Sequence, residues 1–571
     1  MDYKKIYSTW YELGDADERA ELDSIKNDEG ELKRRFGSLI SFGTGGLRGF
    51  MECGTNSMNT RTVILATQAI CDLIKDCGRT ESGIVVGHDS RNNSRAFAEA
   101  TASVAAANGI KTYIFEDLRP TPELSFAVRE LGCVAGVNIT ASHNPKEYNG
   151  YKAYWEDGGQ LPPEHADIVA AKMKELDIFG CDKICDFNEA VRNGRITVLG
   201  SDLDEKYMSA VLAQAVYPEA IKAAAESLKI VYTPLHGAGR VLVPEVLKRA
   251  GVKHISTVTE QMIPDGNFPT VKKPNPENEE VFTIGVELAN KIGSDIIVAT
   301  DPDADRVGVM IRNANGEFIT ITGNQMGAML LEYILCAYEE TNTVPTLPYA
   351  VKTIVTTPLA ERICDAHGVK LFNVLTGFKF IGEVIKEQEK KNDGSTFVFG
   401  FEESYGYLKG TYARDKDSVV ASMLIAEMTA FYSLKGLSLF DALHNLYEKY
   451  GFFYEKTNEV VMSGADAQEK MAAFMKSLRE NPPTEICGNK IAVLADYLKE
   501  TVTDLKTGDV SPTGLPVSNV LYFVLENRDV LVVRPSGTEP KVKIYYLLSS
   551  DCRENAVCKY EAYKKVIDAL A

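Results

Sequence analysis

A chain of 571 residues is long enough for roughly four domains, and 45% apolar with 25% charged residues is the composition of a globular protein with several cores. The net charge of −18 argues against a nucleic acid as a general partner. The sequence contains no apolar signal core near its start and no run of about 18 apolar residues, so neither a membrane partner nor a transmembrane helix is expected.

The sulfur and imidazole side chains show no metal-binding spacing. The 11 cysteines are scattered without a CxxC pair, and the 7 histidines lack the HExxH pattern. This predicts reduced thiols in a cytoplasmic protein, with neither disulfides nor a zinc site. A cytoplasmic enzyme or a scaffold protein remains.

The first predicted elements alternate between strand and helix. Gly109 and Gly132 stand where C-cap glycines close the two helices. Such alternation predicts βαβ units and a parallel sheet. The strands are expected at 83–87, 111–115 and 133–140, and the helices at 94–109 and 121–132.

The same order occurs twice more before the pattern changes. The second unit places strands at 228–233, 252–258 and 294–300 and helices at 239–251 and 279–293. The third places strands at 350–356, 369–375 and 395–401 and helices at 359–368 and 379–393. From about 452, antiparallel strands are expected at 489–498, 519–528 and 529–548, before a closing helix at 554–571.

The predicted fold is therefore α/β, with three similar domains and a smaller α+β domain at the C-terminus. The expected domains are 1–205, 206–322, 323–450 and 451–571. The last strand of each α/β unit ends in a polar loop: TASHNP at 140, TDPDADR at 300 and FEESYG at 401. Because ligands gather at the carboxyl ends of parallel strands, these loops are expected to face one cleft.

The acidic loop favours a metal site. Asp301, Asp303 and Asp305 alternate directly after a buried strand, and such an oxygen cluster suits a hard divalent cation. An EF-hand is excluded, because Arg306 and Arg312 stand where it needs Gly and Glu. A solvated acidic turn is the alternative. Arg306 either holds an anion or forms a salt bridge to Asp303 or Asp305.

Ser142 and His143 allow a nucleophile site, a phosphate loop or an ordinary turn. Adjacent side chains on an extended segment point apart, and no G-x-S-x-G elbow surrounds Ser142, which argues against acyl transfer. A serine near a metal loop and anion-binding arginines suits phosphoryl transfer, with Ser142 carrying the phosphoryl group.

Other charged loops have a functional and a structural reading. Arg534 with Ser536, Gly537 and Thr538 forms either a phosphate cradle or a hairpin turn. Glu402 and Glu403, with Ser404, either accept hydrogen bonds from sugar hydroxyls or start a helix. The loop GTGGLRG carries Arg48 but is no P-loop. Anion contacts or surface charge are expected of Lys379, Arg414 and Lys416.

The motifs TASHNP, DPDADR, GFEESYG and RPSGTEP, in this order, resemble those of the α-D-phosphohexomutase superfamily, which includes phosphoglucomutases and phosphomannomutases. The resemblance covers residues 40 to 550 approximately and implies a heart-shaped molecule of four domains around a central cleft. It implies that Ser142 is phosphorylated and that Mg²⁺ is bound by Ser142, Asp301, Asp303 and Asp305.

The resemblance also implies the remaining roles. His143 and Lys152 are expected as general acid or base. Substrate contacts are expected of Arg48, Arg306, Thr376, Gly377, Glu402, Ser404 and Lys416. Phosphate contacts are expected of Arg534, Ser536, Gly537 and Thr538. The family's acidic loop often carries glycines where this chain has Pro302 and Ala304, but the side-chain ligands are intact.

The expected activity is that of an α-phosphoglucomutase, which interconverts glucose 1-phosphate and glucose 6-phosphate through glucose 1,6-bisphosphate. The motif TGFKF and the chain length also resemble a branch with phosphopentomutases and a glucose-1,6-bisphosphate synthase, so phosphomannomutase and phosphopentomutase activities are alternatives. From other classes, a catalytically silent sugar-phosphate-binding regulator and a metal-dependent phosphatase remain open. Sugar phosphates are the expected partners, and the expected state is a monomer or homodimer.

Overall fold

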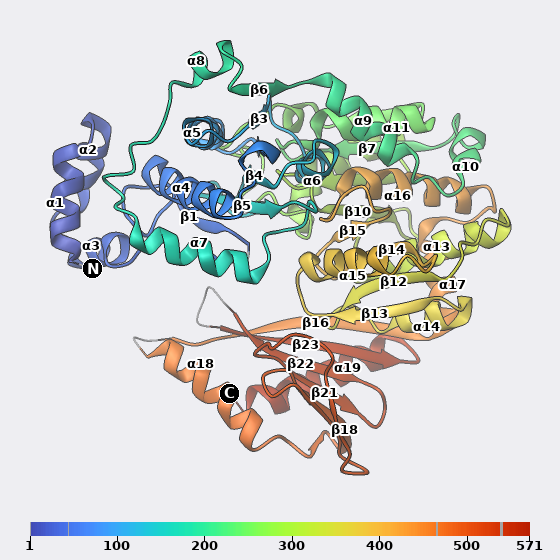
Figure 1. Ribbon diagram of the computed structural model, residues 1–571. Helices are drawn as coiled ribbons and strands as arrows, with labels where there is room; N and C mark the ends of the chain where they lie inside the picture. The colour runs from blue at the N-terminus through green and yellow to red at the C-terminus, as the bar shows by residue number, and fades with distance from the viewer. Residues whose placement is uncertain (1, 44, 464–465, 537–540, 571) are drawn as a thin grey trace.

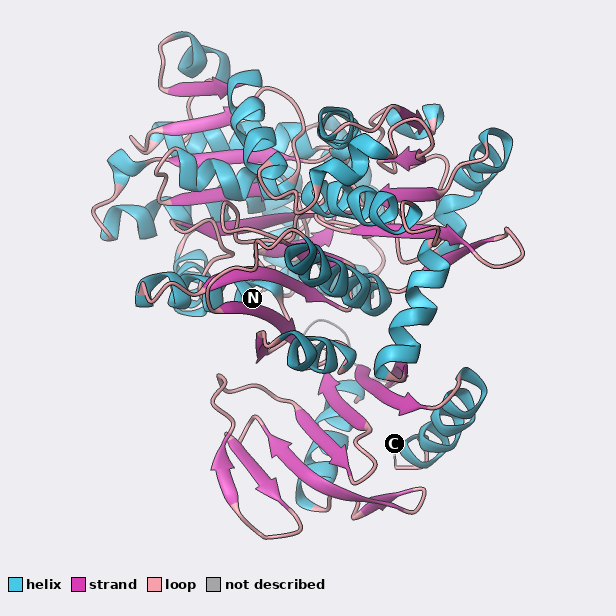
Figure 2. Ribbon diagram, turned by 90° about the vertical axis from the view of Figure 1, so that its right-hand side faces the viewer, coloured by secondary structure: helices cyan, strands magenta, loops and turns pink. Residues whose placement is uncertain are grey.

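The computed structural model describes residues 2–43, 45–463, 466–536 and 541–570, which form four sheets with flanking helices (Figure 1). Three mixed α/β layers occupy the upper part of the view, and the C-terminal antiparallel sheet lies below them (Figures 1 and 2). Within this described part, no helix combines the length and apolarity that crossing a membrane requires. The fold class expected from the sequence is confirmed.

The first sheet has the strand order β1-β5-β4-β2-β3-β6. Its strands β2, β3, β4 and β6 are parallel, as predicted, whereas β1 and β5 are antiparallel to their neighbours. The link from β4 to β5 is a short loop, too short for a parallel crossover, so β5 folds back as a hairpin. The strands are β1 (Leu47–Phe50), β2 (Ile84–His88), β3 (Thr112–Phe115), β4 (Ala135–Ile139), β5 (Tyr148–Trp155) and β6 (Ile196–Leu199).

Helices cover this sheet, and three further helices, α1 to α3, precede its first strand. Gly109 and Gly132 follow α5 and α6 with φ of 74° and 63°, as expected of C-cap glycines. The helices are α1 (Tyr3–Leu13), α2 (Ala16–Ile25), α3 (Glu29–Phe36), α4 (Thr60–Asp76), α5 (Ser94–Ala107), α6 (Thr121–Glu130), α7 (Pro163–Glu175), α8 (Phe187–Arg192) and α9 (Ser201–Leu212).

The second sheet has the order β11-β10-β9-β7-β8. The predicted helix at 279–293 starts later than expected, because residues 279–282 form a 3₁₀ turn. The strands are β7 (Lys229–Thr233), β8 (His254–Thr257), β9 (Ile296–Thr300), β10 (Val307–Arg312) and β11 (Phe318–Ile321). The helices are α10 (Pro218–Ala223), α11 (Gly239–Ala250) and α12 (Thr283–Ile292).

The third sheet has the order β13-β12-β14-β15, with β15 antiparallel. The strands are β12 (Pro348–Thr353), β13 (Lys370–Val374), β14 (Thr396–Glu402) and β15 (Gly406–Leu408). The helices are α13 (Gly323–Glu340), α14 (Leu359–His367), α15 (Phe378–Lys391), α16 (Ser418–Ser433) and α17 (Leu439–Tyr450).

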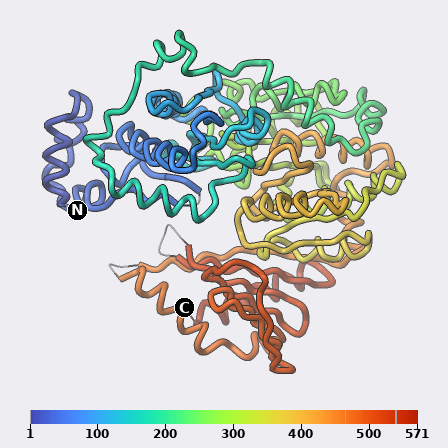
Figure 3. The backbone as a smooth tube through the Cα atoms, in the orientation of Figure 1, coloured from blue at the N-terminus to red at the C-terminus, as the bar shows by residue number. Residues whose placement is uncertain are grey.

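Helix α16 joins the second and third units. It is buried from Ser418 to Phe431 and packs against α10 and α11 of the second unit, which the tube view shows as an orange segment among green ones (Figure 3). Its N-cap Asp417 accepts hydrogen bonds from Val419 N and from the hydroxyl of Tyr207 in α9. The helix therefore fixes the chain just before it, which includes Lys416, against the first two units.

The fourth sheet is antiparallel throughout, as predicted, with the order β16-β23-β22-β21-β18-β19-β20 and β17 on β18. The strands are β16 (Phe452–Val461), β17 (Glu485–Ile486), β18 (Asn489–Asp496), β19 (Thr501–Asp504), β20 (Val510–Pro512), β21 (Leu521–Leu525), β22 (Val530–Pro535) and β23 (Lys541–Ser550). The helices are α18 (Ala467–Glu480) and α19 (Arg553–Asp568).

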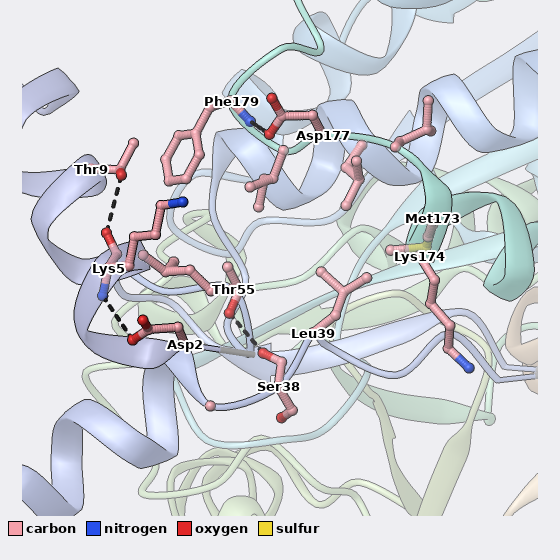
Figure 4. A pocket seen from close by; sticks show the side chains of 15 residues that line it. Asp2, Lys5, Thr9, Ser38, Leu39, Thr55, Met173, Lys174, Asp177 and Phe179 are labelled. Carbon is pink, nitrogen blue, oxygen red and sulfur yellow. Dashed lines mark hydrogen bonds between the residues drawn. The ribbon is translucent and has the colours of Figure 1, made fainter.

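A cavity of about 920 Å³ separates α1 from the first sheet's layer (Figure 4). Lys5, Phe179 and Met173 are among the side chains around it. None of its lining residues belongs to the three polar loops. This cavity therefore lies apart from the loops at the strand ends.

Candidate active site

The three polar loops follow the carboxyl ends of β4, β9 and β14, and the first two touch directly. Ser142, whose side chain is buried, donates from Oγ to Asp301 Oδ2 at 2.8 Å. Its backbone N–H donates to Thr140 Oγ1 at 2.8 Å. The expectation that the serine loop and the acidic loop meet is confirmed.

Ser142 and His143 converge, contrary to the prediction that their side chains point apart. Ser142 has a φ of 52°, so the backbone turns there instead of running extended. This turn places Ser142 Oγ 3.2 Å from His143 Nδ1. Burial, and then the charges of Arg306, Lys273 and Arg48, hold the pKa of His143 well below its ordinary value. His143 is therefore a neutral base beside the serine.

The acidic loop wraps tightly around Asp301. Asp301 Oδ1 accepts the backbone N–H groups of Asp305 at 3.1 Å and Arg306 at 3.0 Å. All three aspartates are buried, and burial with the charges of Asp303 and Asp305 raises the pKa of Asp301 well above its ordinary value. A solvated acidic turn is therefore excluded.

These aspartates fit a hard cation. One carboxylate oxygen from each lies within 4.8 Å of the others. Asp303 Oδ1 and Asp305 Oδ1 are buried and have no hydrogen-bond partner in the described ranges. Buried carboxylate oxygens without a hydrogen-bond partner are costly, and all-oxygen ligands are those that hard divalent ions prefer. The donor set therefore suits an ion such as Mg²⁺.

Two lysines extend this network over the first three units. Lys152 Nζ, on β5, lies 2.6 Å from Asp303 Oδ2 and 2.8 Å from Asp305 Oδ2. Lys416 Nζ, at the start of α16, lies 3.3 Å from Asp305 Oδ2 and 2.8 Å from Asp415 Oδ1. Despite their burial, the nearby aspartates raise the pKa of both lysines, so both are cations.

The third loop presents a carboxylate of a different kind. Glu402 ends β14, and its Oε1 accepts the backbone N–H of Gly377 at 3.0 Å. Burial raises the pKa of Glu402 to about 7. Because β15 follows at Gly406, the helix-start reading of this loop is wrong. Thr376 and Ser404, both half-buried, adjoin these residues in the chain.

Arg48 contacts the serine loop, and Arg306 contacts the acidic loop. Arg48 Nη1 donates to Asn144 Oδ1 at 3.2 Å, one turn beyond Ser142. Arg306 forms the salt bridge that was the alternative to anion binding, with Nε 3.8 Å from Asp305 Oδ1, and also donates from Nη1 to Glu277 Oε1 at 3.0 Å. Neither contact removes an arginine from reach of an anion.

The phosphate loop of the fourth sheet is described only in part. Arg534 lies on β22. Burial raises the pKa of Glu403, and the charge of Arg534 opposes this shift, which indicates that Arg534 lies near the third loop. The backbone N–H of Ser536 donates to Lys541 O at 2.8 Å, which pairs the end of β22 with the start of β23. Gly537 and Thr538 lie outside the described residues.

Arg414 and Lys379, which were predicted to contact anions, contact neighbouring groups of the protein. Arg414 is buried, donates to Ala413 O at 3.2 Å and pairs with Glu389, so it is neither a surface charge nor free for an anion. Lys379 Nζ lies 4.7 Å from the ring centre of Phe380.

The sequence analysis missed the clamp that holds the serine loop. The buried guanidinium of Arg91 donates to four carbonyls, and its Nε lies 3.2 Å from Asp89 Oδ2. Asp89 Oδ2 also accepts the hydroxyl of Thr140 at 2.6 Å. The four carbonyls belong to Ser142, Asn144, Pro145 and Tyr148. The signal was the polar run HDSR at 88–91 at the end of a buried strand.

Sequence profiles of the phosphoglucomutase/phosphomannomutase family match in three parts, as α/β/α domain I over residues 39–178, domain II over 205–316 and domain III over 322–450. The chain belongs to this family, within the α-D-phosphohexomutase superfamily expected from its motifs. It is a mutase enzyme.

Individual relatives agree with this assignment. A phosphoglucomutase from Staphylococcus saprophyticus is 35% identical over 534 residues, which cover 94% of this chain and 95% of the relative. One from Staphylococcus aureus is 35% identical over 520 residues, with 91% of each chain covered.

Two solved structures share the fold. One is a putative phosphomannomutase from Thermus thermophilus, with a TM-score of 0.67 and 23% identity over 93% of this chain and 99% of that one. The other is the Paramecium phosphoglucomutase parafusin in an open form, with a TM-score of 0.69 and 17% identity over 93% and 95%.

Proposed function

We propose that this enzyme is an α-phosphoglucomutase, which interconverts glucose 1-phosphate and glucose 6-phosphate through a phosphoserine at Ser142. The 35%-identical phosphoglucomutases support the substrate. The observation that carries the mechanism is the direct contact of Ser142 Oγ with Asp301 Oδ2, at 2.8 Å, beside a neutral histidine.

In the first half of the cycle, the free hydroxyl oxygen of the sugar phosphate attacks the phosphorus on Ser142. The hydroxyl gives up its proton, a new phosphorus–oxygen bond forms, the bond from phosphorus to Ser142 Oγ breaks and Oγ takes up a proton, so that the product is glucose 1,6-bisphosphate. In the second half, the bisphosphate turns over and Ser142 Oγ attacks its other phosphorus, while the bond from that phosphorus to its sugar oxygen breaks and this oxygen leaves as a hydroxyl with a proton. The serine proton passes to His143, whose depressed pKa and 3.2 Å contact suit a general base.

Lys152 stays a candidate general acid or base. Its ammonium lies within hydrogen-bond distance of Asp303 and Asp305, so it also places a positive charge beside the transferring phosphoryl group. Lys416 supplies a second positive charge from the segment just before α16. Such positioning and charge neutralisation is most of what phosphoryl transfer needs.

Mg²⁺ is the metal that we assign to Ser142, Asp301, Asp303 and Asp305. When bound, it supplies charge neutralisation for the transferring phosphoryl group. Asp303→Asn is expected to weaken magnesium binding and to lower kcat much more than it raises KM. Isothermal titration with Mg²⁺ and steady-state kinetics check this, and an unchanged magnesium dependence contradicts the assignment.

The substrate contacts follow the two remaining loops. Thr376, Gly377, Glu402 and Ser404 would hold the sugar, with Glu402 as the acceptor for its hydroxyls. Arg48 and Arg306 would face the phosphate near Ser142. Arg534, Ser536, Gly537 and Thr538 would hold the distal phosphate. This last set must accept either phosphate of the sugar in turn, which suits hydroxyl and backbone donors.

The test of the substrate is turnover with Mg²⁺ on the 1-phosphates of glucose, mannose, ribose and deoxyribose. The proposal predicts the highest kcat/KM for glucose 1-phosphate. A higher value for mannose or a pentose assigns the enzyme to phosphomannomutase or phosphopentomutase activity instead. A protein without turnover on any of them, and without phosphate on Ser142, would be a sugar-phosphate-binding regulator.

A further inference from the structure

A second group of metal-ligating side chains lies between helices of the third unit. Glu332 and Cys336 are four residues apart on α13, so they share one helix face. His367 is the last residue of α14. One ligand atom from each of the three lies within 4.8 Å of the others.

The spacing fits a tetrahedral ion. Glu332 Oε2 lies 3.2 Å from His367 Nε2, and Glu332 Oε1 lies 3.6 Å from Cys336 Sγ. With zinc–ligand distances of about 2.0 Å to nitrogen or oxygen and about 2.3 Å to sulfur, ligand atoms of a tetrahedral site lie about 3.3 to about 3.5 Å apart. The two measured separations start from different oxygens of Glu332, so one of these oxygens has to turn toward both partners. Side-chain shifts on the order of one ångström would bring the three ligand atoms to the distances that a zinc ion requires.

The residues around the group resemble the outer support of a metal site. Glu339 Oε1 lies 2.7 Å from His367 Nδ1, which leaves Nε2 facing Glu332 and Cys336. A carboxylate that holds the second nitrogen of a ligating histidine in this way is typical of zinc sites. Lys449 and Tyr450, at the end of α17, hold Glu332 at 2.8 and 2.9 Å.

We propose that Glu332, Cys336 and His367 bind a thiolate-preferring divalent cation such as Zn²⁺, at a site separate from the aspartate cluster. Oxygen, nitrogen and sulfur donors together suit zinc and not magnesium. The site departs from the prediction of no zinc site, because its ligands come from two helices and have no local spacing for a motif to show. It also ties α13 and α14 to the end of α17, just before β16 leads into the fourth sheet.

Without the ion, the same side chains form an ionic network. Hydrogen bonds to Cys336 and Glu332 raise the pKa of His367 to about 10, so its ring is protonated.

The experiment uses full-length enzyme that is stripped of metals with a chelator and then supplied with excess Mg²⁺ for the aspartate site. Co²⁺ is titrated as a spectroscopic probe. We expect one Co²⁺ per chain with a sulfur-to-cobalt charge-transfer band, displaced by Zn²⁺. Cys336→Ser is expected to lose the band, and His367→Gln to bind Co²⁺ at least about tenfold more weakly.

Cys558→Ser, which removes an exposed thiol on α19, is the matched control and should keep the band. Zn²⁺ should also raise the Tm of the wild type and of this control, but not that of Cys336→Ser. Circular dichroism confirms that each variant is folded. A wild type without the band, or a band that persists in Cys336→Ser, overturns the proposal and leaves the group as an ionic network. Mutase activity with Mg²⁺ should be unchanged in Cys336→Ser, so this outcome is independent of the proposed function.

Discussion

Glu402 is a buried acid of the site without an ammonium in hydrogen-bond contact among the described residues. Asp303 and Asp305 each have the ammonium of Lys152 within hydrogen-bond distance, whereas Glu402 accepts the backbone N–H of Gly377 and is attracted by the charges of Lys416 and Arg306 without such a contact. Burial therefore raises its pKa to about 7. Below that pH the side chain is a neutral acid, and above it a carboxylate.

This ionisation predicts a pH-dependent affinity for the sugar. A carboxylate accepts hydrogen bonds from hydroxyls more strongly than the neutral acid does, so KM should fall as the pH rises through about 7. Glu402→Gln cannot ionise and should lose this inflection, while any slope that remains belongs to the substrate phosphate. KM measured from pH 6 to 8 for both proteins checks this, and an identical inflection in the variant refutes it.

At the scale of the structural element, the conformation of the serine loop depends on one guanidinium group, that of Arg91. Arg91 donates to four carbonyls between Ser142 and Tyr148, and the salt bridge with Asp89 holds Arg91 in place. It touches no reacting atom and is a positioning residue. Its five donors in a fixed plane are what a lysine lacks.

Arg91→Lys is therefore expected to lower kcat by about a hundredfold, because small displacements of a reacting group are costly, with little change in KM. The variant keeps a positive charge beside Asp89, so the fold should survive. Arg95→Lys, in an exposed pair with Glu99 on α5, is the matched control. Equal kcat in the two variants would show that the clamp does not position Ser142.

The central parallel strands of the three α/β units and the loops after them were predictable, since alternating periods and C-cap glycines are local signals, whereas the strands β1, β5, β6, β10, β11 and β15 were missed. Helix α16 was not, because it is buried almost all round and has no polar stripe to set a helical period. The helices α1 to α3 were missed in a polar segment whose caps, such as Asp15 and Asp28, only became informative once the helices were seen.

The site residues were largely predictable from four motifs, but their geometry was not. The convergence of Ser142 and His143 depends on a φ of 52°, and that angle is set by contacts with Asp301 and Arg91 from other elements. The protonated state of Lys152 depends in the same way on two aspartates about 150 residues away. Long-range contacts of this kind leave no mark in a local pattern.

At the scale of the whole molecule, the site joins elements from all four sheets. Ser142 comes from the first, the aspartates from the second, and Glu402 and Lys416 from the third. Arg534 comes from the fourth. The proposed contact of Arg534 with the distal phosphate would link the last sheet to the other three, so its loss should affect ground state and transition state alike.

Arg534→Ala should consequently raise KM for both sugar phosphates by about ten- to a hundredfold, the range expected for a lost hydrogen bond to a charged group. A smaller loss of kcat is expected, since remote binding helps to close the site. Lys506→Ala, an exposed lysine of the same sheet, controls for the change in charge. Unchanged KM values in Arg534→Ala would place the distal phosphate elsewhere.

The most direct test of the account is the dependence of activity on the phosphate of Ser142. The protein is dephosphorylated, the loss of one phosphoryl group from Ser142 is verified by mass spectrometry, and turnover of glucose 1-phosphate is measured with and without a trace of glucose 1,6-bisphosphate. We predict no turnover without the bisphosphate, and restored turnover with it, because the bisphosphate loads Ser142 and leaves as a monophosphate. Full activity without the bisphosphate, with Ser142 unmodified, would contradict the phosphoserine mechanism.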